Sequence, residues 1–245
     1  MSIDLHQIVT GQSRPIPRLG LRALAWLLGY PDAQRRSQLP EIAEVLVREG
    51  GLSARRLAGL HALIAQLQGP DPMAVEAEYV ELFDRGRATS LHLFEHVHGD
   101  SRDRGPAMVD LIQTYEQSGL LLRPDAHGEL PDYLPTVLEF TSTLDGQAAR
   151  DFTGEFAHIL NALHGALAKR QSLYAHIPAA VLEWMGHPLE ASEPLPDEPM
   201  DAVWAEPPAF NGCSTSSRPA GFPQPVHIVR TQASTPSHPN RGGAA

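Results

Sequence analysis

Cysteine and long apolar runs are scarce in this chain of 245 residues, and each scarcity excludes a class of protein. The single cysteine, Cys213, leaves no partner for an internal disulfide and no second thiolate for a cysteine-based zinc cluster. It has no cysteine or histidine at ligand spacing, so we assign it no redox or metal role. No apolar run approaches the ~18 residues of a membrane-spanning helix, and residues 1–14 lack the apolar core of a secretory leader. We therefore expect a soluble, cytoplasmic protein without direct membrane insertion.

Positive charge is also in deficit. The chain has 19 Lys and Arg residues against 29 Asp and Glu residues, which gives a formal net charge of -10 at pH 7. Nucleic acid and anionic membranes bind to a clustered basic face, which such a chain is not expected to offer. We therefore expect no nucleic acid among its partners, and a basic polypeptide as the better candidate.

Strand-like alternation is missing, and helical spacing of apolar residues takes its place. From Leu21 to Leu28, for example, apolar side chains recur at i, i+3, i+4 and i+7. Ser53, Asp71 and Asp103 are predicted helix caps, and Gly119 is a predicted stop. Helices are expected around 21–28, 39–46, 57–67, 72–83, 91–98, 104–118, 137–144, 152–167 and 181–185. The pattern predicts an all-α fold, a single helical-bundle domain of roughly eight to ten helices.

Proline usage divides the chain. Half of its 22 prolines lie from His187 onward, where the apolar periodicity ends. A segment of that kind buries too little apolar surface to offset its ordering entropy. We predict an N-terminal arm at 1–18, the all-α domain at 19–186, and a Pro-rich, mostly disordered tail at 187–245. Two apolar stretches of the tail, Trp204–Phe210 and Gln224–Val229, are interpreted either as docking segments or as plain linker.

His92, Glu95 and His96 spell H-x-x-E-H, the pattern of one class of zinc hydrolases. On a continuous helix the two imidazoles would share one face, with the carboxylate beside them to activate water. Spacing marks no third ligand, since several downstream acids fit equally well. The same side chains can instead be hydrogen-bonded surface residues, or one wall of an amphipathic groove that recognises a peptide. The zinc hydrolase is kept as the alternative function.

Aromatic and acidic residues meet at the end of the helix expected at 72–83. Tyr79 and Phe83 lie one turn apart, a spacing that usually places rings in the core. If they line a groove instead, Glu81 and Asp84 supply a rim that attracts a cationic peptide. The charged loop at 99–105 is either a helix connection with paired arginines or a further contact surface.

Two motifs carry a resemblance to a known family. SLHLFEHVHGDSRDRG at 90–105 and ELPDYLP at 129–135 resemble the NarJ branch of the TorD/DmsD/NarJ redox-enzyme maturation proteins, and the resemblance extends over about 19–186. Relatives carry a Pro-x-Asp-His type motif implicated in binding a leader peptide; here Asp132 takes the place of the aspartate, directly after Pro131, whereas Tyr133 stands in the place of the histidine. The resemblance therefore supports a contact at Asp132 and does not carry over a histidine-based role.

The resemblance implies a non-enzymatic assembly chaperone for respiratory nitrate reductase that carries no cofactor or metal of its own. Such a chaperone binds the apo catalytic (alpha) subunit, at its N-terminal segment, and holds it for insertion of molybdenum cofactor and iron–sulfur cluster. Proteins of molybdenum cofactor biosynthesis are further candidate partners. We interpret the capture as a helix in a groove, with apolar side chains below and acids around the rim. The expected client-binding residues are Tyr79, Phe83, Asp84, Leu91, His92, Phe94, Glu95, His96, His98, Asp100, Arg102, Arg104, Glu129, Pro131, Asp132 and Tyr133.

Overall fold

The computed structural model describes residues 15–99, 101–122 and 129–191. All of them belong to the first of two compact units, Met1–Ala205, while the second unit, Glu206–Ala245, lies outside the described residues. The tail interpretations for 204–210 and 224–229 also lie outside them. Within the described ranges the chain forms ten α-helices and two short 3-10 turns without any strand, so the all-α prediction is confirmed.

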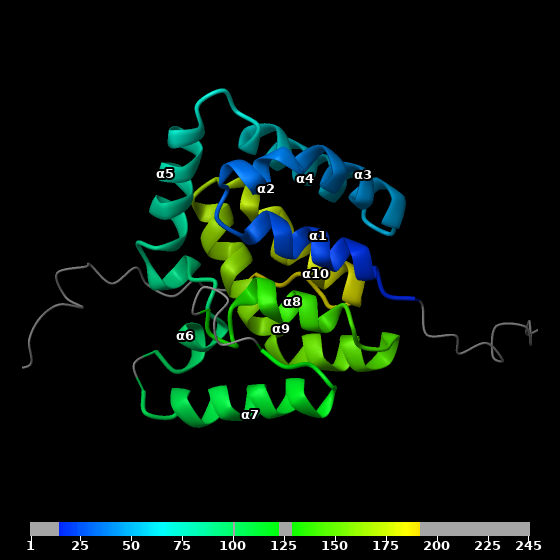
Figure 1. The fold of residues 1–245 in the computed structure, drawn as a ribbon, viewed down its shortest axis with the longest axis vertical. Helices are drawn as coiled ribbons and strands as arrows, with labels where there is room; N and C mark the ends of the chain where they lie inside the picture. Colours follow the sequence, from blue (N-terminus) through cyan, green and yellow to red (C-terminus); the bar gives the residue numbers. More distant parts are fainter. Residues whose placement is uncertain (1–14, 100, 123–128, 192–245) are drawn as a thin grey trace, which may run out of the picture. The chain divides into compact units, whose positions relative to one another are not determined.

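The helices follow one another as labelled in Figure 1. They are α1 (Arg18–Leu28), α2 (Ala33–Ser37), α3 (Leu39–Glu49), α4 (Ala54–Leu67), α5 (Pro72–Phe83), α6 (Leu93–Val97), α7 (Arg104–Gln117), α8 (Leu134–Thr141), α9 (Gly146–Lys169) and α10 (His176–Met185), with the 3-10 turns Arg87–Thr89 and Leu173–Ala175. No helix among the described residues has the length and apolar character needed to cross a membrane.

Helices α1 and α10 form the centre of the core. Leu24 of α1 and Ile177 and Leu182 of α10 have no exposed surface. Helix α1 packs mainly on α8 and α3, whereas α10 packs mainly on α9 and α4 (Figure 1). Each fully buried aliphatic side chain of this kind stabilises the fold by about 1.5–3 kcal/mol, so these contacts fix the framework on which the outer helices are mounted.

The predicted caps explain several helix starts. Ser53 Oγ accepts a hydrogen bond from the backbone N–H of Arg56 at 3.4 Å, and Asp71 Oδ1 accepts from two backbone N–H groups of α5 at 3.1 and 3.2 Å. Asp103 precedes α7 as predicted, although its side chain makes no capping bond. Gly119 ends α7 with a φ of +80°, a left-handed conformation that glycine adopts without a Cβ clash.

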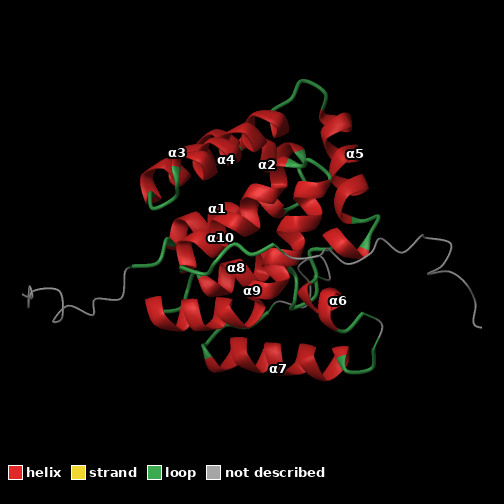
Figure 2. Ribbon diagram, turned by 180° about the vertical axis from the view of Figure 1, so that it is seen from behind, coloured by secondary structure: helices red, strands yellow, loops and turns green. Residues whose placement is uncertain are grey.

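Helix α7 is a peripheral element. Figure 2 shows it along one edge of the bundle, beyond α9. Tyr115 is its only buried side chain; the hydroxyl donates to Pro131 O at 2.8 Å, and the ring lies 4.5 Å from that of Phe140. The attachment of α7 to the domain therefore depends mainly on one aromatic residue.

Besides shifts at several helix ends, the structure differs from the sequence-based expectation in two places. The short α2 was not predicted, because Ala33–Ser37 contains no apolar residue beyond its first. At the other end, the ordered domain continues past Gly186: His187 Nε2 donates to Arg150 O at 3.0 Å, and Asn161 Oδ1 accepts from the backbone N–H of Glu190 at 2.8 Å. Residues 187–190 are thus attached to α9, while the disorder expected for the tail stays a prediction.

Candidate functional site

A groove opens between the end of α5 and two segments that are far apart in the sequence. Its volume is about 470 Å³, within the range of about 300–1,000 Å³ that is typical of ligand sites. We call it the aromatic groove; it is lined by Tyr30, Tyr79, Phe83, Asp84, Ser90, Leu91, His92, Glu129, Leu130 and Tyr133. The groove therefore combines aromatic and aliphatic walls with two carboxylates.

The aromatic wall is anchored from below. Tyr79 and Phe83 are each only 6% exposed, and their ring centroids lie 4.8 Å apart. The Tyr79 hydroxyl donates to Leu28 O, at the end of α1, at 2.7 Å, and Tyr30 meets the Tyr79 ring edge-on at 5.7 Å. Burial raises the pKa of the Tyr79 phenol, so this hydroxyl stays neutral and acts as a hydrogen-bond donor. These rings belong both to the core and to the groove.

A short pairing of extended backbone forms the opposite wall. Leu93 N donates to Asp132 O at 3.0 Å, and Leu134 N donates to Leu91 O at 2.8 Å. Between these two bonds His92 and Tyr133 form an isolated antiparallel bridge, with ring centroids 5.4 Å apart. This pairing places the two sequence motifs side by side.

Asp132 is the residue that organises this wall. Its side chain has no exposed surface, and Oδ2 accepts a hydrogen bond from Phe94 N at 2.9 Å, which caps α6 from outside the helix. Arg104 Nη2 lies 3.9 Å from Oδ2, and His92 Nδ1 lies 3.4 Å from Oδ1. A buried carboxylate is tolerated when it has such partners. Asp132 was expected on the acidic rim; the structure instead places its carboxylate below the surface, among partners within the protein, and its contact with the client stays a prediction.

Two arginines bind Glu95 of α6: Arg87 from the preceding 3-10 turn, and Arg104 from the end of the charged loop, where α7 begins. Arg87 Nε donates to Glu95 O at 2.6 Å, and Arg104 Nη2 contacts Glu95 Oε1 at 3.3 Å. The interpretation of this segment as a helix connection with a paired arginine is confirmed for the Arg104–Glu95 pair. Glu95 is thereby engaged with the protein itself.

The H-x-x-E-H pattern does not have the geometry that the zinc alternative requires. Helix α6 begins at Leu93, so His92 lies before it and the prediction that His92, Glu95 and His96 share one helical face is wrong. The helix starts late because Asp132 caps it and Ser90 Oγ accepts from His92 N at 3.1 Å. His96 Nε2 donates to Ser90 O at 2.8 Å. Among the described residues no group of three or more His, Cys, Asp or Glu side chains could hold a metal ion.

The structure places some of the predicted client-binding residues in the aromatic groove and others outside it. Those that line the aromatic groove are Tyr79, Phe83, Asp84, Leu91, His92, Glu129 and Tyr133. Phe94, Glu95, His96, His98, Arg104, Pro131 and Asp132 do not line it; Arg102 is exposed in the loop before α7, and Asp100 lies outside the described residues. Tyr30, Ser90 and Leu130 were missed. Tyr30 had a signal, since an exposed aromatic residue between Gly29 and Pro31 at a helix end is unusual in a plain turn.

The groove has an acidic rim. Asp84 and Glu129 are both exposed, and Glu76 Oε2 accepts from the Tyr30 hydroxyl at 2.8 Å next to them. Burial is the main cause that raises the pKa of Tyr133, so its phenol also stays neutral. The floor is uncharged while the rim is negative, an arrangement suited to an apolar side chain flanked by cationic ones.

Acidification should destabilise the domain through two histidines. Burial lowers the pKa of His96, and burial together with the Arg56 guanidinium, 3.2 Å away, lowers the pKa of His176. Because both folded-state pKa values lie below the ordinary value near 6.5, the unfolded chain binds more protons as pH falls. The contribution of the two neutral histidines to the free energy of unfolding is complete above about pH 6.5. It is lost as pH falls through their folded-state pKa values.

Urea unfolding at about pH 7.5 and about pH 5.5 measures this effect. We expect a lower free energy of unfolding at the lower pH, with a smaller difference in His96→Gln and His176→Gln. An unchanged pH dependence in both variants would contradict the assignment to these histidines.

Comparison with known proteins shows the family to which the chain is similar. The family model described as nitrate reductase delta subunit matches residues 49–178. The protein named "Nitrate reductase molybdenum cofactor assembly chaperone NarJ" in Escherichia coli strain K12 is 41% identical over 190 residues, covering 74% of this chain and 79% of the relative. A Bacillus subtilis strain 168 protein, "Probable nitrate reductase molybdenum cofactor assembly chaperone NarJ", is 36% identical over 167 residues, covering 67% of this chain and 88% of the relative. The matched region includes α5, α6 and the segment around Tyr133.

Proposed function

Since this chain belongs to the nitrate reductase delta subunit family, we propose that it is an assembly chaperone that binds the apo alpha subunit of a respiratory nitrate reductase. Relatives at 41% and 36% identity are named as molybdenum cofactor assembly chaperones, not as catalysts, so the chain works by binding. Its client is held competent for insertion of molybdenum cofactor and iron–sulfur cluster. In this proposal the step takes place in the cytoplasm, before the subunit docks at the membrane.

One observation supports the binding mode above all others: the aromatic groove has apolar walls and an acidic rim. Leu91 and Tyr133 supply the walls, while Asp84 and Glu129 supply exposed carboxylates. An amphipathic helix from the client's N-terminal segment would bury its apolar side chains between these walls, and its arginines would meet the rim. The net charge of -10 would further speed the encounter with a cationic segment.

Release follows from the same chemistry. The rim carboxylates are solvent-exposed, so each ion pair with the client adds little affinity, and mass action can reverse the binding. Once the client folds, its N-terminal segment is held in the mature enzyme, and the population of free segment available to the groove falls. The chaperone therefore needs no energy source and no covalent step.

Removing the two rim charges tests this assignment. We expect Asp84→Asn combined with Glu129→Gln to weaken binding of the alpha-subunit N-terminal peptide about three- to tenfold at low salt, because each exposed charge pair contributes about 0.2–1 kcal/mol. The affinity of the variant should also depend less on ionic strength between about 0.05 M and about 0.5 M salt. Isothermal titration calorimetry measures both quantities.

Glu41→Gln with Glu44→Gln is the matched control, since it removes the same charge from exposed positions on α3, outside the groove. Equal losses in the control and the rim variant would assign the effect to net charge alone. Unchanged affinity and unchanged salt dependence in the rim variant would refute the acidic rim.

A further inference from the structure

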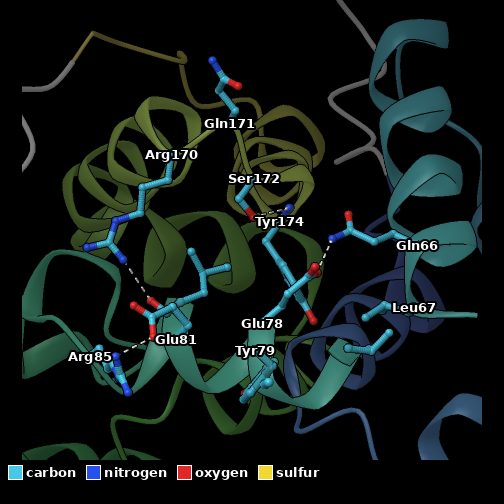
Figure 3. Close-up of a pocket in the computed structure, with 13 residues that line it drawn as sticks. Gln66, Leu67, Glu78, Tyr79, Glu81, Arg85, Arg170, Gln171, Ser172 and Tyr174 are labelled. Atoms are coloured by element: carbon cyan, nitrogen blue, oxygen red, sulfur yellow. Dashed lines mark hydrogen bonds and ion pairs between the residues drawn. The ribbon is translucent and has the colours of Figure 1, made fainter. Parts of the chain in front are cut away.

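A second cavity lies on another side of α5, and the proposed function does not use it. Its volume is about 740 Å³, larger than that of the aromatic groove. The end of α4, the exposed side of α5 and the turn after α9 surround it (Figure 3). We call it the α5 cavity; its floor includes Leu67, Val75, Leu82 and Tyr174, and polar side chains stand around its opening.

The Tyr174 hydroxyl gives this cavity an unmet bonding requirement. Tyr174 is only 5% exposed, and its hydroxyl has no hydrogen-bond partner among the described residues. A buried hydroxyl without a partner destabilises the fold, so a native structure is expected to give it one. The ring is fixed edge-on against Phe83 at 4.9 Å, so the hydroxyl cannot easily turn toward solvent.

Among the charged side chains around the opening, one carboxylate remains available to a ligand. Arg85 pairs with Glu81 at 2.8 Å, and Arg170 donates to Leu82 O at 3.3 Å, so both arginines already have acceptors within the protein. Glu78 is exposed, and its hydrogen-bond donor within the described part of the chain is a neutral group, the Gln66 amide, at 2.9 Å. A carboxylate so placed keeps its negative charge facing the cavity.

The Glu78 carboxylate and the Tyr174 hydroxyl can both accept hydrogen bonds from the same ligand group. Figure 3 shows their side chains next to each other in the middle of the cavity. Burial, and after it the charge of Glu78, raises the pKa of the Tyr174 phenol, so the hydroxyl is neutral and can accept a hydrogen bond. The carboxyl end of α4 already has a cationic partner, because Arg36 donates to Leu67 O at 2.8 Å and to Gly69 O at 2.6 Å. An ammonium or guanidinium group from a ligand satisfies both the Glu78 carboxylate and the Tyr174 hydroxyl, because it only donates.

We propose that the α5 cavity is a second peptide-binding site, which takes a lysine or arginine side chain from a segment of the client other than its N-terminal one. The aliphatic stem packs on Leu67, Val75 and Leu82, and the cationic head donates to Glu78 and to the Tyr174 hydroxyl. This inference rests on the proposed function, since it concerns the same client. It adds a separate contact that does not pass through the aromatic groove.

Two conservative substitutions test the site in the full-length chain. Glu78→Gln removes the charge from an exposed position, and Tyr174→Phe removes only an unpartnered hydroxyl, so both variants should fold. The probes are the N-terminal peptide of the alpha subunit and the apo alpha subunit lacking that peptide, both measured by calorimetry. We expect each variant to bind the truncated subunit about tenfold more weakly, since each removes one charge-assisted hydrogen bond to the cationic head. Binding of the N-terminal peptide should stay unchanged, and Glu41→Gln should change neither.

Each other outcome is decisive. Truncated subunit that binds wild type and both variants equally overturns this inference alone. Wild-type chain that binds neither probe overturns the proposed function, and this inference with it. A photo-crosslinker at the exposed Ala77, which lines the cavity, then identifies the segment captured. Crosslinks should fall on a stretch of the alpha subunit that contains lysine or arginine, and crosslinks confined to the N-terminal peptide would overturn the assignment of a separate segment.

Discussion

Replacing Asp132 with alanine should lower the free energy of unfolding by about 3 kcal/mol, since removal of one member of a buried charged network costs about 3–5 kcal/mol. The substitution removes the acceptor for Phe94 N and leaves the nearby Arg104 guanidinium without one of its two carboxylates. Helix α6 would lose its cap, and the pairing that carries Leu91 and Tyr133 would loosen. Urea unfolding measures the loss of stability, and calorimetry should show weaker binding of the N-terminal peptide.

Asp84→Ala is the comparison that separates support from contact. Asp84 lines the aromatic groove itself and is exposed, so its removal should change stability by no more than about 0.5 kcal/mol while it still weakens peptide binding. Asp132→Asn keeps the shape and loses the charge, and it should fall between wild type and Asp132→Ala in stability. If Asp132→Ala were as stable as Asp84→Ala, the supporting role of the buried carboxylate would be wrong.

Replacing Tyr115 with alanine should detach α7 and lower the free energy of unfolding by about 3–5 kcal/mol, as for other large aromatic truncations in a core. Tyr115 is the one buried side chain of α7, and its hydroxyl also holds Pro131 O next to Asp132. Amide hydrogen exchange should rise throughout α7 far more than in α9 or α10. The same experiment should show faster exchange near Tyr133.

Tyr115→Phe divides this effect into its parts. It keeps the ring contact with Phe140 and removes only the bond to Pro131 O, so the cost should be about 1 kcal/mol and α7 should stay protected. The exposed Val109, on the same helix, gives a control truncation that should leave both stability and exchange nearly unchanged. Exchange in α7 that does not respond to Tyr115→Ala would show that other contacts hold the helix.

Much of the fold was predictable because helix formation depends on local signals. Apolar spacing, together with caps such as Ser53 and Asp71, located the long helices, and the same periodicity placed Tyr79 and Phe83 one turn apart on α5. Helix α2 escaped this reasoning because it has no apolar face. Its stability comes from Asp32, which accepts a hydrogen bond from Arg35 N at 2.7 Å, and from packing against α3.

The candidate site was harder to predict because its key contacts join distant segments. The pairing of His92 with Tyr133 spans a break in the sequence pattern, and periodicity carries no information about which extended segments will meet. For Asp132 the general preference of aspartate for the surface gave the wrong expectation, since a carboxylate with three nearby partners can be buried. The continuous helix assumed from Leu91 to His98 failed for the same reason: a cap supplied from 38 residues away set its start.

Helix α5 has a hollow on each of two sides, and Tyr79 borders both. Because α5 separates the two cavities, a displacement of α5 toward one cavity narrows that cavity and widens the other. A peptide that binds in one cavity only by displacing α5 would therefore weaken binding in the other cavity. A peptide that binds without displacing α5 would leave binding in the other cavity unchanged. By thermodynamic reciprocity, binding in one cavity must change the affinity of the other by the same factor in both directions. Because the Tyr79 hydroxyl donates a hydrogen bond to Leu28 O, the end of α1 limits how far α5 can be displaced.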